Sequence, residues 1–174
     1  MDHPTPNALP NPLLVRTTHD KDGKSVFVPD QTLTPFRPFG PQASGFTIFD
    51  ARASVPVNNM DVIPSFAEQL PRCPPNGAMF AISDIAPGTN APCHRTESID
   101  YACVLSGEIV LRLDSGEERT LRAGEFLVQQ GTNHSWINNT EKPCRMVFVM
   151  MSAEKIVIID GTVLEETVFK GVPK

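Results

Sequence analysis

A series of short apolar segments separated by glycine turns limits what this chain can fold into more than any other feature. "MFAISDI" runs into the Pro87-Gly88 turn, "DYACVLSG" ends at Gly107, and "EIVLRLD" and "ERTLRAG" flank Ser115-Gly116. "FLVQQG", "HSWINN" and "CRMVFVMMSA" complete the series. Segments this short, without sustained helical periodicity, predict an all-β protein built as an antiparallel sandwich or barrel.

The first 78 residues differ from the rest because they contain most of the 17 prolines. Proline is excluded from helix interiors and central strands, so we expect an extended Pro-rich arm with edge strands. Within it, "LLVRTTHDKDGKSVFV" predicts a hairpin and "SGFTIFDARA" a further strand. "IPSFAEQL" and "GTVLEETVFK" are candidates for short helices. The expected organisation is an arm (1–78), a barrel (79–153) and a C-terminal extension (154–174).

The overall charge narrows the possible partners. The net charge is −5 and the pI is near 5.3, which argues against a nucleic-acid or anionic-membrane surface. No apolar run approaches the roughly 20 residues of a membrane span. The N-terminal "MDHPTPNALPNPLL" lacks the basic start and apolar stretch of a signal peptide. A cytoplasmic location is therefore expected.

The four cysteines show no C-x-x-C spacing, which favours free thiols in a reducing compartment. Cys93 precedes His94, which suggests a shared metal ion. Neighbouring side chains on a strand point to opposite faces, however, so Cys93 is not expected to be a ligand.

Two motifs in residues 79–153 resemble those of a single cupin domain, the small double-sheet jelly roll. In the first, Gly88 is followed after five residues by His94-Arg95-Thr96, then by Asp100 and Gly107. Thr96 replaces the second histidine of the family pattern, and Asp100 replaces its glutamate. In the second, "GEFLVQQGTNHSWINN" supplies Gly124, His134 and Asn138, although Gln130 stands in the proline region and the loop is one residue short.

The residues around these motifs narrow the family resemblance to one subgroup. "HRTESIDY", "VLSGEIVLRLDSGE" and "VQQGTNHSWINN" are similar to a subgroup of small cupins, some of which occur in microbial pathways for aromatic and polyketide compounds. A Pro-rich arm with a "DGK"-like hairpin recurs in that subgroup. The resemblance implies an architecture and the position of a site, and it leaves the substrate open.

The residues of the candidate site follow from strand alternation. Asp100 shares a strand face with Ala102 and Val104, and His134 shares one with Trp136 and Asn138. In the cupin register these faces look into the barrel, together with His94. A carboxylate in an apolar barrel is costly unless it is paired or coordinated, so His94, Asp100 and His134 are the candidate catalytic residues. A structural Asp100 bonded to backbone is the alternative.

The same three residues are the candidate metal ligands. Two imidazoles and one carboxylate suit Fe(II), with Zn or Mn as alternatives. Thr96 is at best a weak neutral ligand, and Asp100 is one methylene shorter than glutamate. The sequence therefore leaves open whether a metal is bound.

Four further residues are candidates for contact with substrate. Thr96 and Gln129 could hydrogen-bond it, although the sequence does not decide whether Gln129 or Gln130 faces the cavity. Trp136 could stack on an aromatic ligand, or could simply pack in the barrel. Asn138 follows on the same strand face.

The expected function is that of a small-molecule enzyme, a lyase or isomerase that carries out dehydration, decarboxylation or tautomerisation on an aromatic or polyketide-like substrate inside the barrel. An Fe(II)-dependent dioxygenase and a non-catalytic binding module are the alternatives. The apolar arm segment "VFVPDQTLTPFRPF" predicts a homodimer, because it can cover an open sheet edge of a partner.

Overall fold

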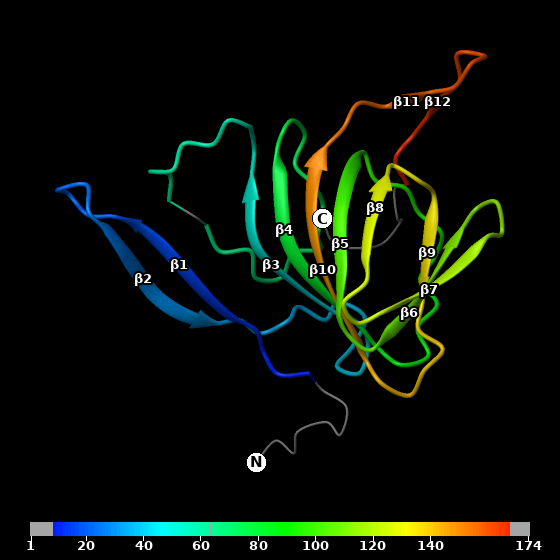
Figure 1. Ribbon diagram of the computed structural model, residues 1–174, viewed down its shortest axis with the longest axis horizontal. Coiled ribbons are helices and arrows are strands. Elements are labelled where there is room, and N and C mark those ends of the chain that lie inside the picture. The colour runs from blue at the N-terminus through cyan, green and yellow to red at the C-terminus, as the bar shows by residue number, and fades with distance from the viewer. Residues whose placement is uncertain (1–8, 63, 168–174) are drawn as a thin grey trace.

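The computed structural model describes residues 9–62 and 64–167, and strands are the regular elements among them (Figure 1). The first six strands are β1 (Leu13–His19), β2 (Ser25–Thr32), β3 (Gly45–Arg52), β4 (Ala78–Ile85), β5 (Ser98–Ser106) and β6 (Glu108–Leu113). The other six are β7 (Glu118–Arg122), β8 (Phe126–Gln130), β9 (His134–Ile137), β10 (Cys144–Ser152), β11 (Ile156–Val157) and β12 (Val163–Leu164). The all-β prediction is confirmed.

Two antiparallel sheets form the body of the protein. The larger has the strand order β3-β4-β10-β5-β8, and the smaller has the order β7-β6-β9. Figure 1 shows the smaller sheet beside and behind the β8 side of the larger one. Their non-consecutive strand order is that of a jelly roll, in which the inner faces of the two sheets meet.

The core fills the space between the sheets. Val104 on β5, Ile109 on β6 and Met146 on β10 are each at most 1% exposed. Phe148 on β10 contacts both this cluster and a second one around Met79 and Met150. The apolar core therefore extends along the larger sheet and ends beside Asp100, which pairs with Met150 across β5 and β10.

The arm contains the hairpin and the further strand that the sequence predicted. β1 and β2 form a separate two-stranded sheet around a turn at residues 20–24, where Gly23 has a φ of 77°. This hairpin stands out from the body on the side of β3 (Figure 1). β3 itself pairs with β4 and completes the edge of the larger sheet.

The prediction of two short helices is wrong for the residues that the structure describes. Residues 64–70 follow an irregular path with Glu68 at a φ of 65°, because the stretch between Pro64 and Pro71 is too short to form a stable helix. In the other segment, Val163 and Leu164 form β12 and pair with β11. Residues 63 and 168–170 of these two candidates lie outside the described residues.

The described residues include no helix long and apolar enough to cross a membrane. The four cysteines are free thiols, and Cys93 is exposed to solvent.

Candidate functional site

Asp100 lies on the inner face of the larger sheet, where apolar side chains would be expected. It is 3% exposed and stands in register with Met150 of β10 on one side and Gln129 of β8 on the other. Its neighbours along β5 alternate as the sequence predicted, with Ala102 buried and Tyr101 exposed. Strand alternation thus places one carboxylate at the end of the apolar core.

Two hydrogen bonds hold this carboxylate. The Ser98 hydroxyl donates to Oδ1 at 2.6 Å, and the Gln129 amide donates to Oδ2 at 3.1 Å. Burial raises the pKa of Asp100 above its usual value, while the two hydrogen bonds and the nearby His94 act in the opposite direction. Asp100 is therefore a carboxyl group whose proton affinity is greater than that of an exposed aspartate.

His134 on β9 is the second buried titratable group. It is 2% exposed, and its Nδ1 lies 3.0 Å from the Thr132 carbonyl. Because a carbonyl can only accept, Nδ1 carries the hydrogen and Nε2 keeps a lone pair. Burial, together with the charge of His94, lowers the pKa of His134 to about 4. The imidazole is therefore neutral at pH 7.

His94 reaches the same place from the segment before β5. Its backbone pairs with that of His134 through hydrogen bonds of 2.8 and 2.9 Å, and the two rings lie 4.3 Å apart between centroids. His94 Nδ1 lies 2.9 Å from the Pro92 carbonyl, so this ring also keeps its lone pair on Nε2 when neutral. Unlike His134, His94 is only partly buried.

Gln129 joins the carboxylate to the imidazole. Its amide nitrogen lies 3.1 Å from Asp100 Oδ2 and 3.4 Å from His134 Nε2. Gln129 is buried whereas Gln130 is exposed, so the register that the sequence left open places Gln129 inside. Gln129 Oε1 is buried and has no hydrogen-bond partner among the residues that the structure describes. An orphaned buried acceptor of this kind costs about 1–3 kcal/mol, and a ligand hydroxyl could satisfy it.

Ser98 is a member of the site that the sequence analysis missed. It is 1% exposed, and its hydroxyl lies 3.0 Å from Thr96 Oγ1 as well as 2.6 Å from Asp100. The spacing of two residues from Asp100 on one strand was the signal available in the sequence. Thr96 therefore reaches Asp100 through Ser98.

Trp136 and Asn138, two of the candidate substrate-binding residues, are in contact with other protein groups. Trp136 is 7% exposed and packs edge-on against His134 and Phe148, with centroid distances of 5.4 and 6.0 Å. The Asn138 amide donates to the carbonyls of Ile85 and Lys142 and accepts from Thr140. Asn138 thus holds the loop after β9, and Trp136 supports the His134 ring from within the core.

The three expected metal ligands do not assemble into a site for an ion. The two imidazoles are suitable by type and tautomer, and hydrogen bonds such as that from Ser98 to Asp100 are common for ligating carboxylates. The Gln129 amide nitrogen, however, lies against both Asp100 and His134 and directs hydrogen-bond donors where a cation would sit. Within residues 9–62 and 64–167, no group of three His, Cys, Asp or Glu side chains could hold a metal ion. The described geometry therefore does not fit the three-ligand centre for Fe, Zn or Mn that the sequence suggested.

A pocket of about 270 Å³ lies next to this group, at the end of the barrel where β5 begins. Thr96 and Ser98 line it on the barrel side, and Ile156 and Leu164 of the C-terminal hairpin line it on the other. The pocket thus lies next to Thr96 and Ser98, the two residues that connect with Asp100.

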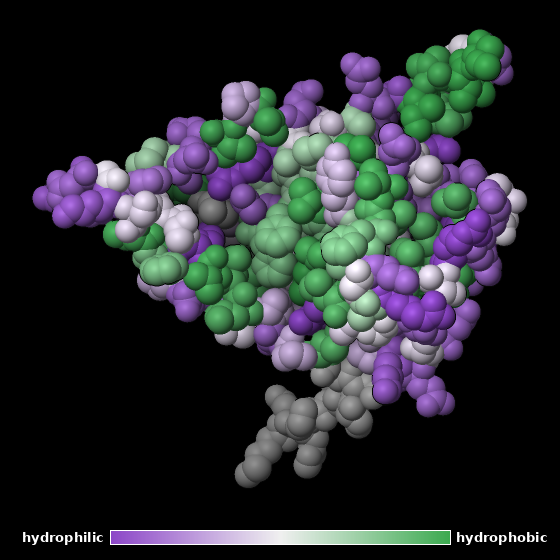
Figure 2. All heavy atoms as spheres, viewed as in Figure 1, coloured by the Kyte–Doolittle hydropathy of each residue, from purple (hydrophilic) through white to green (hydrophobic). Residues whose placement is uncertain are grey.

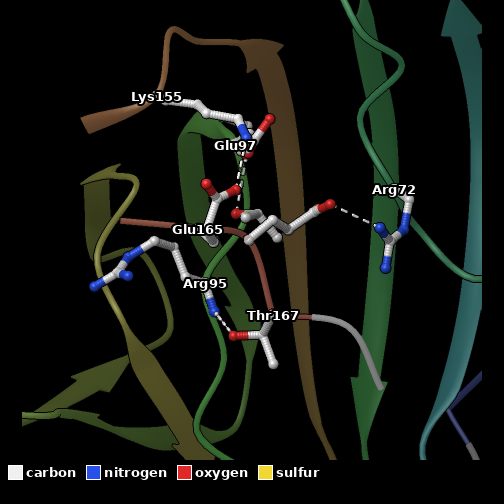
Figure 3. Close-up of polar contacts among 9 residues, drawn as sticks. Arg72, Arg95, Glu97, Lys155, Glu165 and Thr167 are labelled. Carbon is white, nitrogen blue, oxygen red and sulfur yellow. Dashed lines mark hydrogen bonds and ion pairs between the residues drawn. The ribbon is translucent and has the colours of Figure 1, made fainter. Parts of the chain in front are cut away.

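The C-terminal strap, residues 163–167, is fastened beside this pocket by the contacts in Figure 3. Thr167 donates its N–H to the Arg95 carbonyl, and its hydroxyl accepts from the Arg95 N–H at 2.9 Å. Glu166 pairs with Arg72 at 2.8 Å. Lys155 pairs with Glu165 and Glu97. The strap therefore links the chain before β5 to the chain before β4.

Comparisons with known proteins agree with this architecture. Residues 81–150 match the Cupin_2 family, described as a cupin domain. Phomopsin biosynthesis cluster protein C' of Diaporthe leptostromiformis is 42% identical over 158 residues, covering 85% of this chain and 82% of that protein. The cupin-domain-containing oxidoreductase virC of Hypocrea virens is 34% identical over 172 residues, covering 91% of this chain and 88% of that protein.

A solved structure shows the same fold at low identity. The cupin domain of Schizosaccharomyces pombe Cnp3 superposes with a TM-score of 0.51 at 10% identity, covering 80% of this chain and 87% of that one. The two sheets, the matched domain and the relatives that span most of the chain lead to one conclusion: this protein belongs to the cupin family, with relatives among fungal proteins of secondary-metabolite clusters.

Proposed function

We propose that this cupin is an enzyme that moves protons on a small organic molecule, as a lyase or isomerase does. The observation that carries the proposal is the buried contact of Asp100, Gln129 and His134. Burial raises the pKa of the Asp100 carboxyl and lowers the pKa of the His134 imidazole to about 4. Groups of different type whose pKa values are shifted by one environment are suited to acid–base work.

The chemistry follows from which atoms can give and take a proton. His134 Nε2 has a lone pair and can remove a proton from a carbon next to a carbonyl. A protonated Asp100 can return a proton to the opposite face of the enolised carbon, which inverts that carbon and gives an isomerase. If it returns the proton to a β-hydroxyl group instead, water leaves and the reaction is a dehydration. Each route conserves electrons and needs no oxidant.

Gln129 is suited to recognising the substrate. Its unpartnered Oε1 offers a buried acceptor, which an enol or phenol hydroxyl of the substrate would satisfy. The side chains that pack beside His134 include the aromatic rings of Trp136 and Phe148, which are apolar neighbours for a ring system. An aromatic or polyketide-like substrate has both features, and some relatives carry names of biosynthetic clusters.

An oxidoreductase is the second candidate, and the names of relatives favour it. Three proteins that are 33–34% identical to this chain are named cupin-domain-containing oxidoreductases. An oxidation needs an electron acceptor such as molecular oxygen, whereas isomerisation and dehydration do not. The two candidates therefore differ in one requirement that can be measured.

The test is a panel of aromatic ketones and aryl β-hydroxy ketones incubated with the protein, with and without oxygen. Our proposal predicts conversion of at least one probe at the same rate in both conditions, without oxygen uptake. Asp100→Asn should slow that conversion by about a hundredfold to ten-thousandfold, as loss of one proton carrier typically does. Conversion that stops when oxygen is removed would favour the oxidoreductase.

A further inference from the structure

The C-terminal hairpin, formed by β11 and β12, turns one cross-strand pair toward the pocket beside β5 and the other toward solvent. Ile156 pairs with Leu164, and both line the pocket. Val157 pairs with Val163, and these side chains, on the opposite face, are 60% and 40% exposed. Figure 2 shows the hairpin projecting from the body with hydrophobic side chains along it. The hairpin therefore gives the pocket an apolar wall.

The wall on the barrel side comes from the start of β5 and the loop after β8. A Cβ on Gly131 would lie 3.1 Å from Ile156 Cδ1, so Ile156 packs directly against that loop. Ile99 and Ala153 add further apolar surface. The pocket volume of about 270 Å³ is just below the roughly 300–1,000 Å³ of pockets for drug-sized ligands. It therefore suits a compound of one or two rings.

The charged residues that line the pocket balance one another. Arg95 and Lys155 are cations, and Glu97 and Glu154 are anions. Lys155 already pairs with Glu97 at 3.5 Å and with Glu165 at 2.6 Å (Figure 3). Arg95 Nε is bonded to a backbone carbonyl at 3.0 Å. An anionic ligand would meet carboxylates together with cations that already have partners, so the pocket favours a neutral ligand.

Two hydroxyl groups give the pocket a polar end. Thr96 and Ser98 both line it, and their hydroxyl oxygens lie 3.0 Å apart. Ser98 is 1% exposed and bonded to Asp100, whereas Thr96 is only partly buried. Because a hydroxyl can both donate and accept, Thr96 can bond to a hydroxyl or a carbonyl oxygen of a ligand.

From these observations, we infer that the pocket is a binding site for a neutral ring compound that bears a hydroxyl or carbonyl oxygen. The rings lie between the hairpin and the barrel, against Ile156 and Leu164, and the oxygen bonds to Thr96. Binding at this site does not require that the protein is an enzyme. Only the identity of the bound compound as a substrate rests on the proposed function.

Titration calorimetry of the full chain at pH 7 tests the inference with 2-naphthol, a neutral phenol of two fused rings. The comparison ligand is 2-naphthoate, an anion with the same ring system. We expect 2-naphthol to bind saturably at one site per chain, and 2-naphthoate to bind at least about tenfold more weakly. Absence of saturable 2-naphthol binding at about millimolar concentration would overturn the inference, and so would equal affinity for the two ligands.

Variants of the hairpin locate the bound ligand. Ile156→Asp places a charge on the apolar wall and should weaken 2-naphthol binding at least about tenfold. Because an aspartate there could loosen the hairpin, the milder Ile156→Ala is measured as well, and it should weaken binding at least about threefold. Thr96→Val removes the hydroxyl and nearly keeps the shape, so it should weaken binding about twofold to tenfold.

The matched control is Val157→Asp, the same change one residue further along β11 on the face turned away from the pocket. This variant should bind 2-naphthol as the wild-type protein does. Unchanged affinity in both Ile156 variants, or an equal loss in Val157→Asp, would place the ligand elsewhere and overturn the inference.

Parallel incubation with the ketone panel separates this inference from the proposed function. Binding of 2-naphthol that depends on Ile156, in a protein that converts none of the ketones, would support the pocket and contradict the proposed function. Conversion of a ketone by a protein that does not bind 2-naphthol would support the proposed function and contradict the pocket.

Discussion

Asp100 and His134 are buried on either side of one amide group, that of Gln129, and burial shifts the pKa of each toward its neutral form. The two shifts have opposite signs, because the neutral form of a carboxyl carries a proton and the neutral form of an imidazole has lost one. At the residue scale, the candidate site is therefore a pair of groups whose pKa values burial moves in opposite directions. His94, which is less buried, lies next to both.

The lowered pKa of His134 predicts how stability depends on pH. In the unfolded chain this group has its ordinary pKa of 6.5, and in the folded protein the pKa is about 4. As the pH falls through this window, the unfolded state binds a proton that the folded state does not, so the free energy of unfolding decreases. Between pH 7 and pH 5 the loss from this group is about 2 kcal/mol. The raised pKa of Asp100 acts in the opposite direction, because the folded state binds that proton first.

Urea unfolding at pH 7 and pH 5 measures this contribution. The wild-type protein should lose more stability between the two pH values than the variant His134→Gln, in which position 134 no longer titrates. Equal losses in the two proteins would show that His134 binds its proton as readily in the folded protein as in the unfolded chain.

At the element scale, a motif glycine is needed for a close approach of two segments. Gly107, between β5 and β6, has a φ of 79°, and a Cβ there would lie 2.7 Å from the Pro143 carbonyl oxygen and 3.0 Å from Cys144 Cα. Gly116 has a φ of 88° but nothing within 4 Å of such a Cβ. The two glycines therefore share the backbone conformation and differ in the space around them.

Replacing each glycine with alanine separates these two effects. Gly116→Ala should cost about 1–2 kcal/mol, the penalty for the left-handed conformation. Gly107→Ala should cost at least about 1 kcal/mol more, because overpacking against backbone adds to that penalty. Denaturant titration of both variants gives the comparison. Equal losses would mean that the segment around Pro143 moves aside freely.

The C-terminal strap predicts a local change without global unfolding. The Arg72–Glu166 pair is partly exposed, so it contributes about 0–1 kcal/mol to keeping the strap in place. Glu166→Gln should therefore increase hydrogen exchange of the adjacent Thr167 amide, which bonds to the Arg95 carbonyl, by up to about fivefold.

Arg112→Gln is the control for the strap, because it breaks an exposed pair with Glu118 on β6 and β7. It should leave the exchange of Thr167 unchanged. If Glu166→Gln also leaves that exchange unchanged, the ion pair does not hold the strap.

Strand alternation explains how much of this could be predicted from the sequence. The faces of Asp100 and Tyr101 followed from a period of two, and the hairpin before residue 32 followed from its turn residues. The choice between Gln129 and Gln130 depended on the register between β5 and β8, which no local pattern fixes. The strap could not be predicted, because it is held by contacts between segments far apart in the sequence, such as Arg95 and Thr167. The helix predicted at residues 64–70 does not form, because local propensity gives too little weight to the flanking prolines.

At the scale of the whole molecule, the two faces of the larger sheet differ in character. The inner face holds Asp100 and Gln129, and the outer face carries the exposed side chains of Tyr101 and Val128. The homodimer expected from the arm stays a prediction, in which a second copy covers the apolar surface of the arm hairpin, where Phe27 is 74% exposed. Because neighbours along β5 point to opposite faces, substitutions at position 100 should affect the chemistry while those at position 101 should not.

Proton transfer at Asp100 is the central claim, and deuterium entry into the product tests it most directly. A ketone probe without a β-hydroxyl group, which can be isomerised but not dehydrated, is incubated in heavy water without oxygen, with the wild-type protein and with Asp100→Asn, and the product is examined by NMR. We predict that deuterium enters the carbon next to the carbonyl with the wild-type protein, and about a hundredfold to ten-thousandfold more slowly with the variant. A product that carries no deuterium, or that forms only when oxygen is present, would contradict the claim.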